Sequence, residues 1–374
     1  MKRLFIITGE YSGDIHASKV VKELRAINCD LEIEGIGGIN LQNEGVKLFS
    51  TQEKMGAMGL TPQILINHIK LGKALLDYLK NDYKPDLVLL IDYGAFNLTI
   101  ARFLKKAGIK VFYYIPPQVW ASRKYRIKLI QKFVDKVLCI FPFERPLYAQ
   151  YGIDAHYCGH PLVAQLPAPA ERREFFRKHG LDVEKRLVSV FPGSREFELK
   201  HLMSVFKETV TRLSHRHADL QFCISQAPNL SDEVYQKYLG DCDIKVIKGE
   251  NQALLSVSDA LILASGTVAL EACLYKTPMI IAYRGPKFFY WVYLLVRCIK
   301  RVSLPNIIAD KSIVPEIIQD KVTPSNITYE IEELLYNKER REDNIKQLGQ
   351  VKEMLSDKNS ALEVAKVIDT ELFS

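Results

Sequence analysis

Two short runs in the second half of the chain combine glycine, hydroxyl side chains and an arginine. The sequence FPGSR at 191–195 ends one apolar run, and ASGT at 264–267 ends another just before a helical pattern. Backbone N–H groups and hydroxyls at a helix start bind anions, and the arginine fork grips a diphosphate. The runs therefore predict a nucleoside diphosphate site, which consists of Gly193, Ser194, Arg195, Ser265, Gly266 and Thr267.

Glu271 lies one helical turn beyond Thr267 on the same predicted helix face. Its carboxylate is placed to accept hydrogen bonds from ribose hydroxyls, and it could instead act as a capping or surface acid. In the first half, Gly9, Ser12 and Gly13 form a tight turn between a strand and a helix. Glycines there let the backbone approach a ligand, although a plain turn is the alternative. The turn lacks the spacings of dinucleotide-binding and Walker A motifs, which disfavours an oxidoreductase or an NTPase.

Asp92 follows another apolar run, at the strand end where ligands collect in open α/β sheets. It could serve as a base or as a helix cap. The loop after the next run starts with paired prolines and presents Gln118 and Trp120, which suit hydrogen bonding to and stacking on a sugar, unless the indole is buried. Together with Asp14 and Asn97, these two residues are the candidates for contacts with a sugar.

Short β-branched runs alternate with helical patterns through the whole chain, which predicts parallel sheets with crossover helices. A first series of strands is expected at 4–8, 31–35, 87–92, 111–115, 136–140 and 156–157, and a second at 187–191, 220–225, 244–248, 260–263 and 279–283. Because 374 residues exceed what one core supports, we expect two doubly wound, Rossmann-like α/β domains facing a cleft. They would span 1–165 and 171–345, joined by a proline-containing linker at 166–170, with a helical segment at 346–374 crossing back to the first.

Composition indicates the cellular location of the protein and the kinds of partner it binds. The seven cysteines are scattered among apolar segments and are expected to be reduced core residues. The N-terminal apolar run is too short for a signal peptide, and no run reaches the roughly 18 apolar residues of a membrane span, so we expect a cytoplasmic protein. No HExxH motif or Cys/His cluster calls for a metal or another cofactor. Six basic residues at 123–136 oppose only Asp135, a pattern that suits an anionic head group or phosphate rather than nucleic acid.

Laid end to end, these segments resemble those of the lipid-A-disaccharide synthases, bacterial glycosyltransferases with two lobes of the type called GT-B. The segments that carry the resemblance are GEYSGD at 9–14, MGL at 58–60, ID at 91–92, FNL at 96–98, PQVWA at 117–121, PFE at 142–144, GHPL at 159–162, PGSR at 192–195, ASGT at 264–267 with Glu271, and SLPN at 303–306. They run in family order over nearly the whole chain.

The resemblance implies an inverting transfer of 2,3-diacylglucosamine from its UDP derivative to the 6-hydroxyl of 2,3-diacylglucosamine 1-phosphate (lipid X), which releases UDP. It places Asn306 with the UDP-binding residues and gives Arg195 the role of stabilising the leaving diphosphate without a metal. Many relatives carry a second acid where this chain has Ala95. The resemblance therefore leaves Asp92 as the expected base, with Asp14 and Glu10 as the other acids at that edge.

Acylated substrates imply a peripheral site on the inner face of the cytoplasmic membrane. An apolar stripe with lysines at 64–80 and the aromatic run at 288–295 are candidate membrane contacts, and either could be core or the contact of a homodimer. Two other functions share parts of the pattern. A nucleotide-sugar epimerase or another GT-B transferase would account for Ser265, Gly266 and Thr267, and a non-catalytic UDP-sugar binder would account for Ala95.

Overall fold

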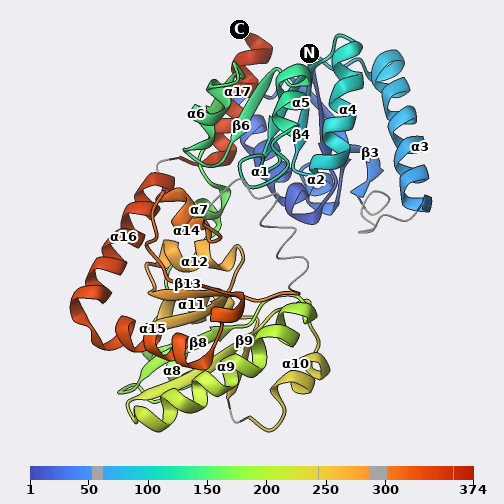
Figure 1. The fold of residues 1–374 in the computed structure, drawn as a ribbon. Coiled ribbons are helices and arrows are strands. Elements are labelled where there is room, and N and C mark those ends of the chain that lie inside the picture. The colour runs from blue at the N-terminus through green and yellow to red at the C-terminus, as the bar shows by residue number, and fades with distance from the viewer. Residues whose placement is uncertain (53–61, 243, 287–300, 357) are drawn as a thin grey trace. The chain divides into compact units, whose positions relative to one another are not determined.

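The computed structural model describes residues 1–374 except 53–61, 243, 287–300 and 357, and leaves out the side chains of 62–65, 67 and 356 (Figure 1). The chain divides into two compact units. Unit 1 contains Met1–Ala164 and Leu355–Ser374, and unit 2 contains Gln165–Met354. The chain thus returns to unit 1 at Leu355 and not at 346, because the last long helix before this point is held in unit 2. Asn344 Nδ2 donates to the carbonyl of Ile313, 2.6 Å away.

Unit 1 is built on a seven-stranded parallel sheet with the order β3-β2-β1-β4-β5-β6-β7. Its strands are β1 Lys2–Thr8, β2 Leu31–Gly37, β3 Lys47–Thr51, β4 Leu87–Ile91, β5 Lys110–Tyr114, β6 Lys136–Cys139 and β7 Ala155–Tyr157. Its helices are α1 Tyr11–Ile27, α2 Ile39–Asn43, α3 Pro62–Tyr78 with a π-helical turn at Leu79–Tyr83, α4 Gly94–Lys106, α5 Arg126–Phe133, α6 Glu144–Ala149, α7 Pro161–Gln165 and α17 Ser360–Phe373.

Unit 2 repeats this architecture around a six-stranded sheet with the order β10-β9-β8-β11-β12-β13. Its strands are β8 Arg186–Phe191, β9 Leu220–Gln226, β10 Lys245–Lys248, β11 Ala260–Ala264, β12 Met279–Tyr283 and β13 Glu316–Ile318. Its helices are α8 Arg172–Lys178, α9 Glu196–Arg216, α10 Asp232–Leu239, α11 Asn251–Val257, α12 Val268–Tyr275, α14 Leu304–Ile308, a 3-10 turn at Gln319–Lys321, α15 Pro324–Tyr336 and α16 Lys338–Ser356.

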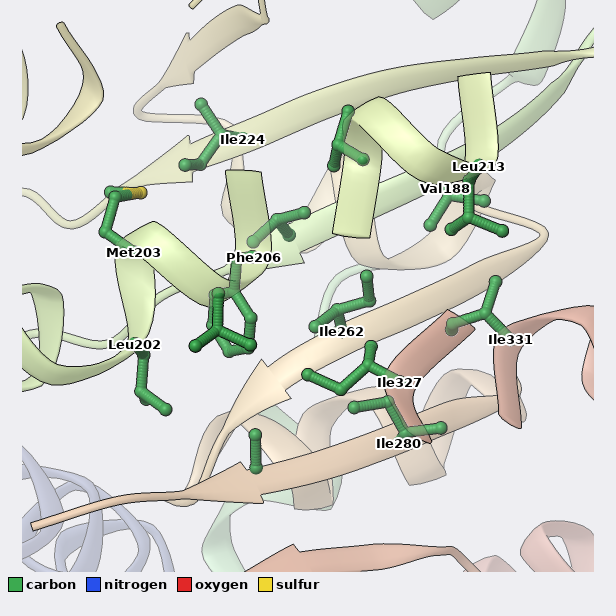
Figure 2. Packing of buried hydrophobic residues seen from close by; sticks show 14 of the residues in the cluster. Val188, Leu202, Met203, Phe206, Leu213, Ile224, Ile262, Ile280, Ile327 and Ile331 are labelled. Carbon is green, nitrogen blue, oxygen red and sulfur yellow. The ribbon is translucent and has the colours of Figure 1, made fainter. Parts of the chain in front are cut away.

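Continuous apolar runs make the central strands, because helices cover both faces of each sheet. All five residues of β4 and of β11 are buried. In unit 2, one face of the sheet packs under α9 and α15, where Phe206 and Ile327 meet Ile262 and Ile280 (Figure 2). The predicted pair of parallel α/β sheets is confirmed.

The order of strands reverses between β1 and β4 in unit 1 and between β8 and β11 in unit 2. In open parallel sheets, ligands bind outside the carboxyl ends of the strands at this reversal, where two crossover helices depart to opposite faces. Asp92 follows β4 directly, and Gly193 and Ser265 follow β8 and β11. The fold therefore brings the sequence motifs to the two positions where a ligand site forms.

The sequence missed two strands, β3 and β13. Both lie at the edge of a sheet and are five and three residues long. Short edge strands are buried on fewer sides, so their sequences lack the apolar run that marks a central strand. The motif at 58–60 and the aromatic run at 288–295 lie outside the described residues. None of the helices that the structure describes is long and apolar enough to cross a bilayer.

The predicted apolar stripe at 64–80 is divided between core and surface. Leu75 and Leu79 are fully buried, whereas Ile66 and Ile69 are about half exposed. The side chains of 64 and 65 lie outside the description. The second half of the stripe therefore belongs to the core of unit 1.

Candidate active site

A cavity of ≈ 310 Å³ opens at the carboxyl ends of β8 and β11 in unit 2. Six of the residues predicted to bind a nucleoside diphosphate line it, namely Gly193, Ser194, Arg195, Ser265, Gly266 and Thr267. The helices α9 and α12 both begin at this cavity. No side chain caps the first turn of α12, so its amide groups remain available for an anion at the positive end of the helix.

Glu198 fixes the turn between β8 and α9. Its Oε2 accepts from the backbone N–H groups of Ser194 at 2.8 Å and of Arg195 at 3.2 Å, and its Oε1 lies 3.4 Å from Arg195 Nη1. Gly193 has φ +114°, and a Cβ there would lie 2.2 Å from the same carboxylate. The turn thus needs glycine, and it presents an exposed guanidinium beside an internal carboxylate.

The far side of this cavity carries a polar pair that the sequence did not indicate. Ser225, in β9, donates to Asn251 Oδ1 at 2.6 Å, and both residues line the cavity. Asn251 is the first residue of α11. The hydroxyl and the amide offer groups that can bind the base or ribose of a nucleotide. No periodicity marks two such residues 26 positions apart, because they meet only through the sheet.

At the reversal point of unit 1, the backbone turns sharply after β4. Asp92 has φ 50° and Tyr93 has φ 47°, a left-handed conformation that is costly for side chains with a Cβ. Two side chains hold the Asp92 carbonyl: Asn97 Nδ2 donates to it at 2.8 Å, and the Tyr113 hydroxyl donates at 2.7 Å. The fold therefore stabilises a strained conformation at the one acid that ends this strand.

Electrostatics mark the same position. Burial raises the pKa of Asp92, and only the backbone N–H of Tyr93 opposes this effect. Burial also raises the pKa of Glu10, and the neighbouring Asp92 carboxylate raises it further. A carboxylate with a raised pKa is a stronger base, so the pair after β1 and β4 suits proton abstraction.

Asp14 and Asn97, which were predicted to contact a sugar, have structural roles. Asp14 is fully buried, and its carboxylate accepts from the N–H groups of Gly38 at 2.7 Å and Asn40 at 3.0 Å, at the start of α2. Asn97 is fully buried and holds the backbone of Asp92. These short polar side chains satisfy backbone groups at turns, and their predicted contact with an acceptor sugar stays a prediction.

Gly9 and Gly13 are closely packed, and their predicted contact with a ligand stays a prediction. A Cβ at Gly9 would lie 2.4 Å from the ring of Tyr93, and one at Gly13 would lie 3.3 Å from Thr8 Cβ. The Tyr93 hydroxyl in turn lies 2.9 Å from His68 Nε2. Ser12 is exposed at the start of α1, so its predicted role stays open as a prediction.

Of the two alternatives for Trp120, the structure shows the buried indole, because the residue is only 9% exposed. Its indole N–H donates to Glu144 Oε1 at 2.9 Å, and Oε2 of the same carboxylate accepts from the backbone of Ile140 and Phe141. Burial raises the pKa of Glu144 to about 7. This pair joins the loops after β5 and β6 and leaves Gln118 exposed at the sheet edge.

Asn306 and Glu271 lie away from the cavity in unit 2. Asn306 is fully buried, and its amide bonds the backbone of Ile313 and Val314 and the carboxylate of Glu316, so it closes a loop of unit 2. Glu271 does not line the cavity, and burial raises its pKa while the Gln252 side chain lowers it. Neither residue lines the cavity, and their predicted roles with ribose and UDP stay predictions.

The sequence also overlooked Glu198, although it carries a local signal. An acid at the third helical position after a turn residue is typical of a capping box, and Arg195 and Glu198 have this spacing. Within the described part of the chain, no three His, Cys, Asp or Glu side chains gather as metal ligands would.

Comparisons with known proteins agree with this geometry. Residues 4–368 match the sequence model of the lipid-A-disaccharide synthetase family. The lipid-A-disaccharide synthase of Myxococcus xanthus is 33% identical over 98% of this chain and 96% of its own, and that of Coxiella burnetii is 34% identical over 100% and 99%.

Solved structures support the fold alone. MurG of Acinetobacter baumannii has a TM-score of 0.61 at 13% identity, covering 99% of this chain and 100% of its own. The UDP-GlcNAc 2-epimerase of Neisseria meningitidis, bound to UDP-GlcNAc, has a TM-score of 0.60 at 14% identity, covering 100% and 99%. On the strength of its sequence over nearly the full length, the chain belongs to the lipid-A-disaccharide synthase family.

Proposed function

We propose that this chain is an inverting hexosyltransferase of lipid A biosynthesis. It transfers 2,3-diacylglucosamine from UDP-2,3-diacylglucosamine to the 6-hydroxyl of 2,3-diacylglucosamine 1-phosphate (lipid X). The bond between the anomeric carbon and the diphosphate breaks, the bond to the acceptor oxygen forms, and UDP leaves. Family membership supports sugar transfer in this biosynthesis. The observation that supports a UDP-sugar as the donor is the cavity at β8 and β11 with its glycine turn, hydroxyls and Arg195.

The donor diphosphate binds between the turn before α9 and the start of α12. Negative charge grows on the leaving oxygen during transfer, and the N–H groups at the helix starts oppose it. Arg195 is exposed at the cavity with its guanidinium beside Glu198, so it can turn toward the diphosphate without losing buried contacts. These groups supply the charge stabilisation that a divalent cation supplies in other transferases, and the transfer therefore proceeds without a metal.

Asp92 removes the proton of the acceptor hydroxyl. Inversion requires one in-line attack, so a single base on the acceptor side is sufficient. The burial that raises the pKa of Asp92 also raises its basicity. Asn97 and Tyr113 keep the aspartate in its left-handed conformation and act as positioning residues. This arrangement compensates for Ala95, where many relatives have an acid.

Because both substrates carry acyl chains, the reaction takes place at the inner face of the cytoplasmic membrane. The test uses purified protein in neutral detergent micelles with both substrates, with and without chelator. We expect a disaccharide with inverted anomeric configuration by NMR, in an amount that chelator does not change. A product that retains the donor configuration would refute the single displacement, and loss of product with chelator would refute the metal-independent mechanism.

A further inference from the structure

The Glu198 carboxylate already occupies hydrogen-bond donors at the start of α9 that the proposed diphosphate would use. Its Oε2 accepts from the N–H groups of Ser194 and Arg195, at 2.8 and 3.2 Å, and its Oε1 lies 3.4 Å from Arg195 Nη1. Two successive backbone N–H groups beside a guanidinium form the kind of site that binds a phosphate. In this structure an internal carboxylate stands where a phosphate would bind.

The start of α12 differs from the start of α9. Both helices begin at the cavity, but no side chain caps the first turn of α12, so its N–H groups remain open to a ligand. Glu198 itself lines the cavity, and its side chain is only 18% exposed. A diphosphate that enters the cavity therefore meets one open helix start and one that already binds an anion.

Helix capping does not explain all the contacts of Glu198. In a capping box, the acid at the third helical position bonds the N–H of the N-cap residue, which is Arg195 here. Glu198 makes that bond, but its shorter bond goes to Ser194, the residue before the cap. Asn229 Nδ2 also holds this turn, because it donates to the Ser194 carbonyl at 2.7 Å. The carboxylate thus bonds more of the phosphate-binding groups than a cap requires.

A phosphate and the Glu198 carboxylate compete for these groups. Each backbone N–H has one hydrogen to donate, so a phosphate oxygen gains the bonds of Ser194 and Arg195 only when Glu198 releases them. The two anions would also repel each other inside the cavity. Arg195, whose side chain is 76% exposed, can change its partner from the carboxylate to the ligand.

We infer that Glu198 is an internal competitor of the donor diphosphate and leaves the N–H groups of Ser194 and Arg195 when UDP or a UDP-sugar binds. The inference rests on the proposed function, in which a UDP-sugar binds this cavity, and it adds a residue that limits the affinity. A site that is available for only a fraction of the time binds its ligand more weakly by that fraction. Glu198 thereby weakens the binding of the product UDP and favours its release.

The test measures the dissociation constants of UDP and of uridine by calorimetry, for the full chain and for Glu198→Gln. The glutamine is of similar size but neutral, and a hydrogen bond to a neutral acceptor is about half as strong as one to a carboxylate. We therefore expect the variant to bind UDP about tenfold more tightly. Uridine lacks the diphosphate, so both proteins should bind it equally, which also shows that the cavity of the variant is folded.

Glu196→Gln is the matched control, because it removes the same charge from the same first turn of α9. The Glu196 carboxylate accepts from Lys237 Nζ at 2.8 Å and from the Tyr238 hydroxyl at 2.9 Å, and it does not line the cavity. This variant should bind UDP like the parent. An equal gain in both variants would overturn the inference, because the charge at the helix end would then explain it without displacement.

Two further results would overturn the inference. Weaker or unchanged UDP binding by Glu198→Gln would identify Glu198 as a brace that shapes the turn for the ligand, and a loss of uridine binding would give it a role in folding alone. Sugar transfer in micelles is measured separately. A parent without transfer whose Glu198→Gln variant binds UDP more tightly refutes the proposed function and leaves the competition standing, whereas an active parent with no gain in the variant refutes the competition alone.

Discussion

Replacement of Glu144 by Gln should change how the stability of unit 1 depends on pH. Burial raises the pKa of this carboxyl from 4.5 to about 7 in the folded protein. A raised folded pKa means that the folded state holds the proton more tightly than the unfolded state. Its stabilising contribution is therefore complete below pH 4.5 and is lost as pH rises to about 7. Each pH unit in this window costs about 1.4 kcal/mol, which gives roughly 3 kcal/mol over the whole window.

Urea unfolding at several pH values measures this effect. The chain has two tryptophans, and a Trp291→Phe background leaves Trp120, which bonds Glu144, as the reporter for unit 1. The difference in unfolding free energy between parent and Glu144→Gln should shift by about 3 kcal/mol in favour of the variant from pH 4.5 to 7 and stay constant above. Asp30→Asn, at an exposed acid, is the matched control. Parallel pH profiles for parent and Glu144→Gln would refute the argument that burial dominates at this carboxyl.

Three further predictions concern stability at acid pH, the proposed base and the proposed donor site. Burial, followed by repulsion from His16, lowers the pKa of His160 from 6.5 to about 4, so its contribution to stability is present above pH 6.5 and is lost as pH falls through 4. In urea unfolding, the free energy of unfolding of His160→Gln should therefore fall less steeply with decreasing pH than that of the parent. An equally steep fall in both proteins would contradict this. Asp92→Asn should lower kcat by about 10²- to 10⁴-fold while donor KM stays unchanged in steady-state kinetics, and near-normal kcat would exclude Asp92 as the base. Arg195→Ala should weaken UDP binding about 10- to 100-fold by calorimetry, the usual loss for a hydrogen bond to a charged group, whereas unchanged affinity would place the diphosphate elsewhere.

The sequence predicted the central strands and the turns that follow them, because these depend on local patterns. Apolar runs mark buried strands, and glycine and hydroxyl residues mark the turns before α9 and α12. The reversal of strand order then brings those turns together at one edge. For this reason, six residues that line the cavity at β8 and β11 could be named from their motifs alone.

What the sequence could not predict depends on contacts between distant residues. The sequence left open whether Trp120 is exposed or buried, and a carboxylate 24 positions away accepts from its indole N–H inside the protein. Asp14 and Asn306 stand in motifs beside the site, yet their amides and carboxylates satisfy buried backbone groups. Residue type alone cannot distinguish a polar side chain that binds a ligand from one that supports a loop, because both need the same hydrogen-bonding groups.

The most direct test of the central claim is the rate of UDP release from UDP-2,3-diacylglucosamine in neutral micelles, measured with and without lipid X. Sugar transfer between two lipid substrates predicts release that depends on lipid X and matches the disaccharide formed. Tight binding of the donor without release in the presence of lipid X would contradict it, and would identify the chain as a UDP-sugar binder in which Ala95 has removed the chemistry.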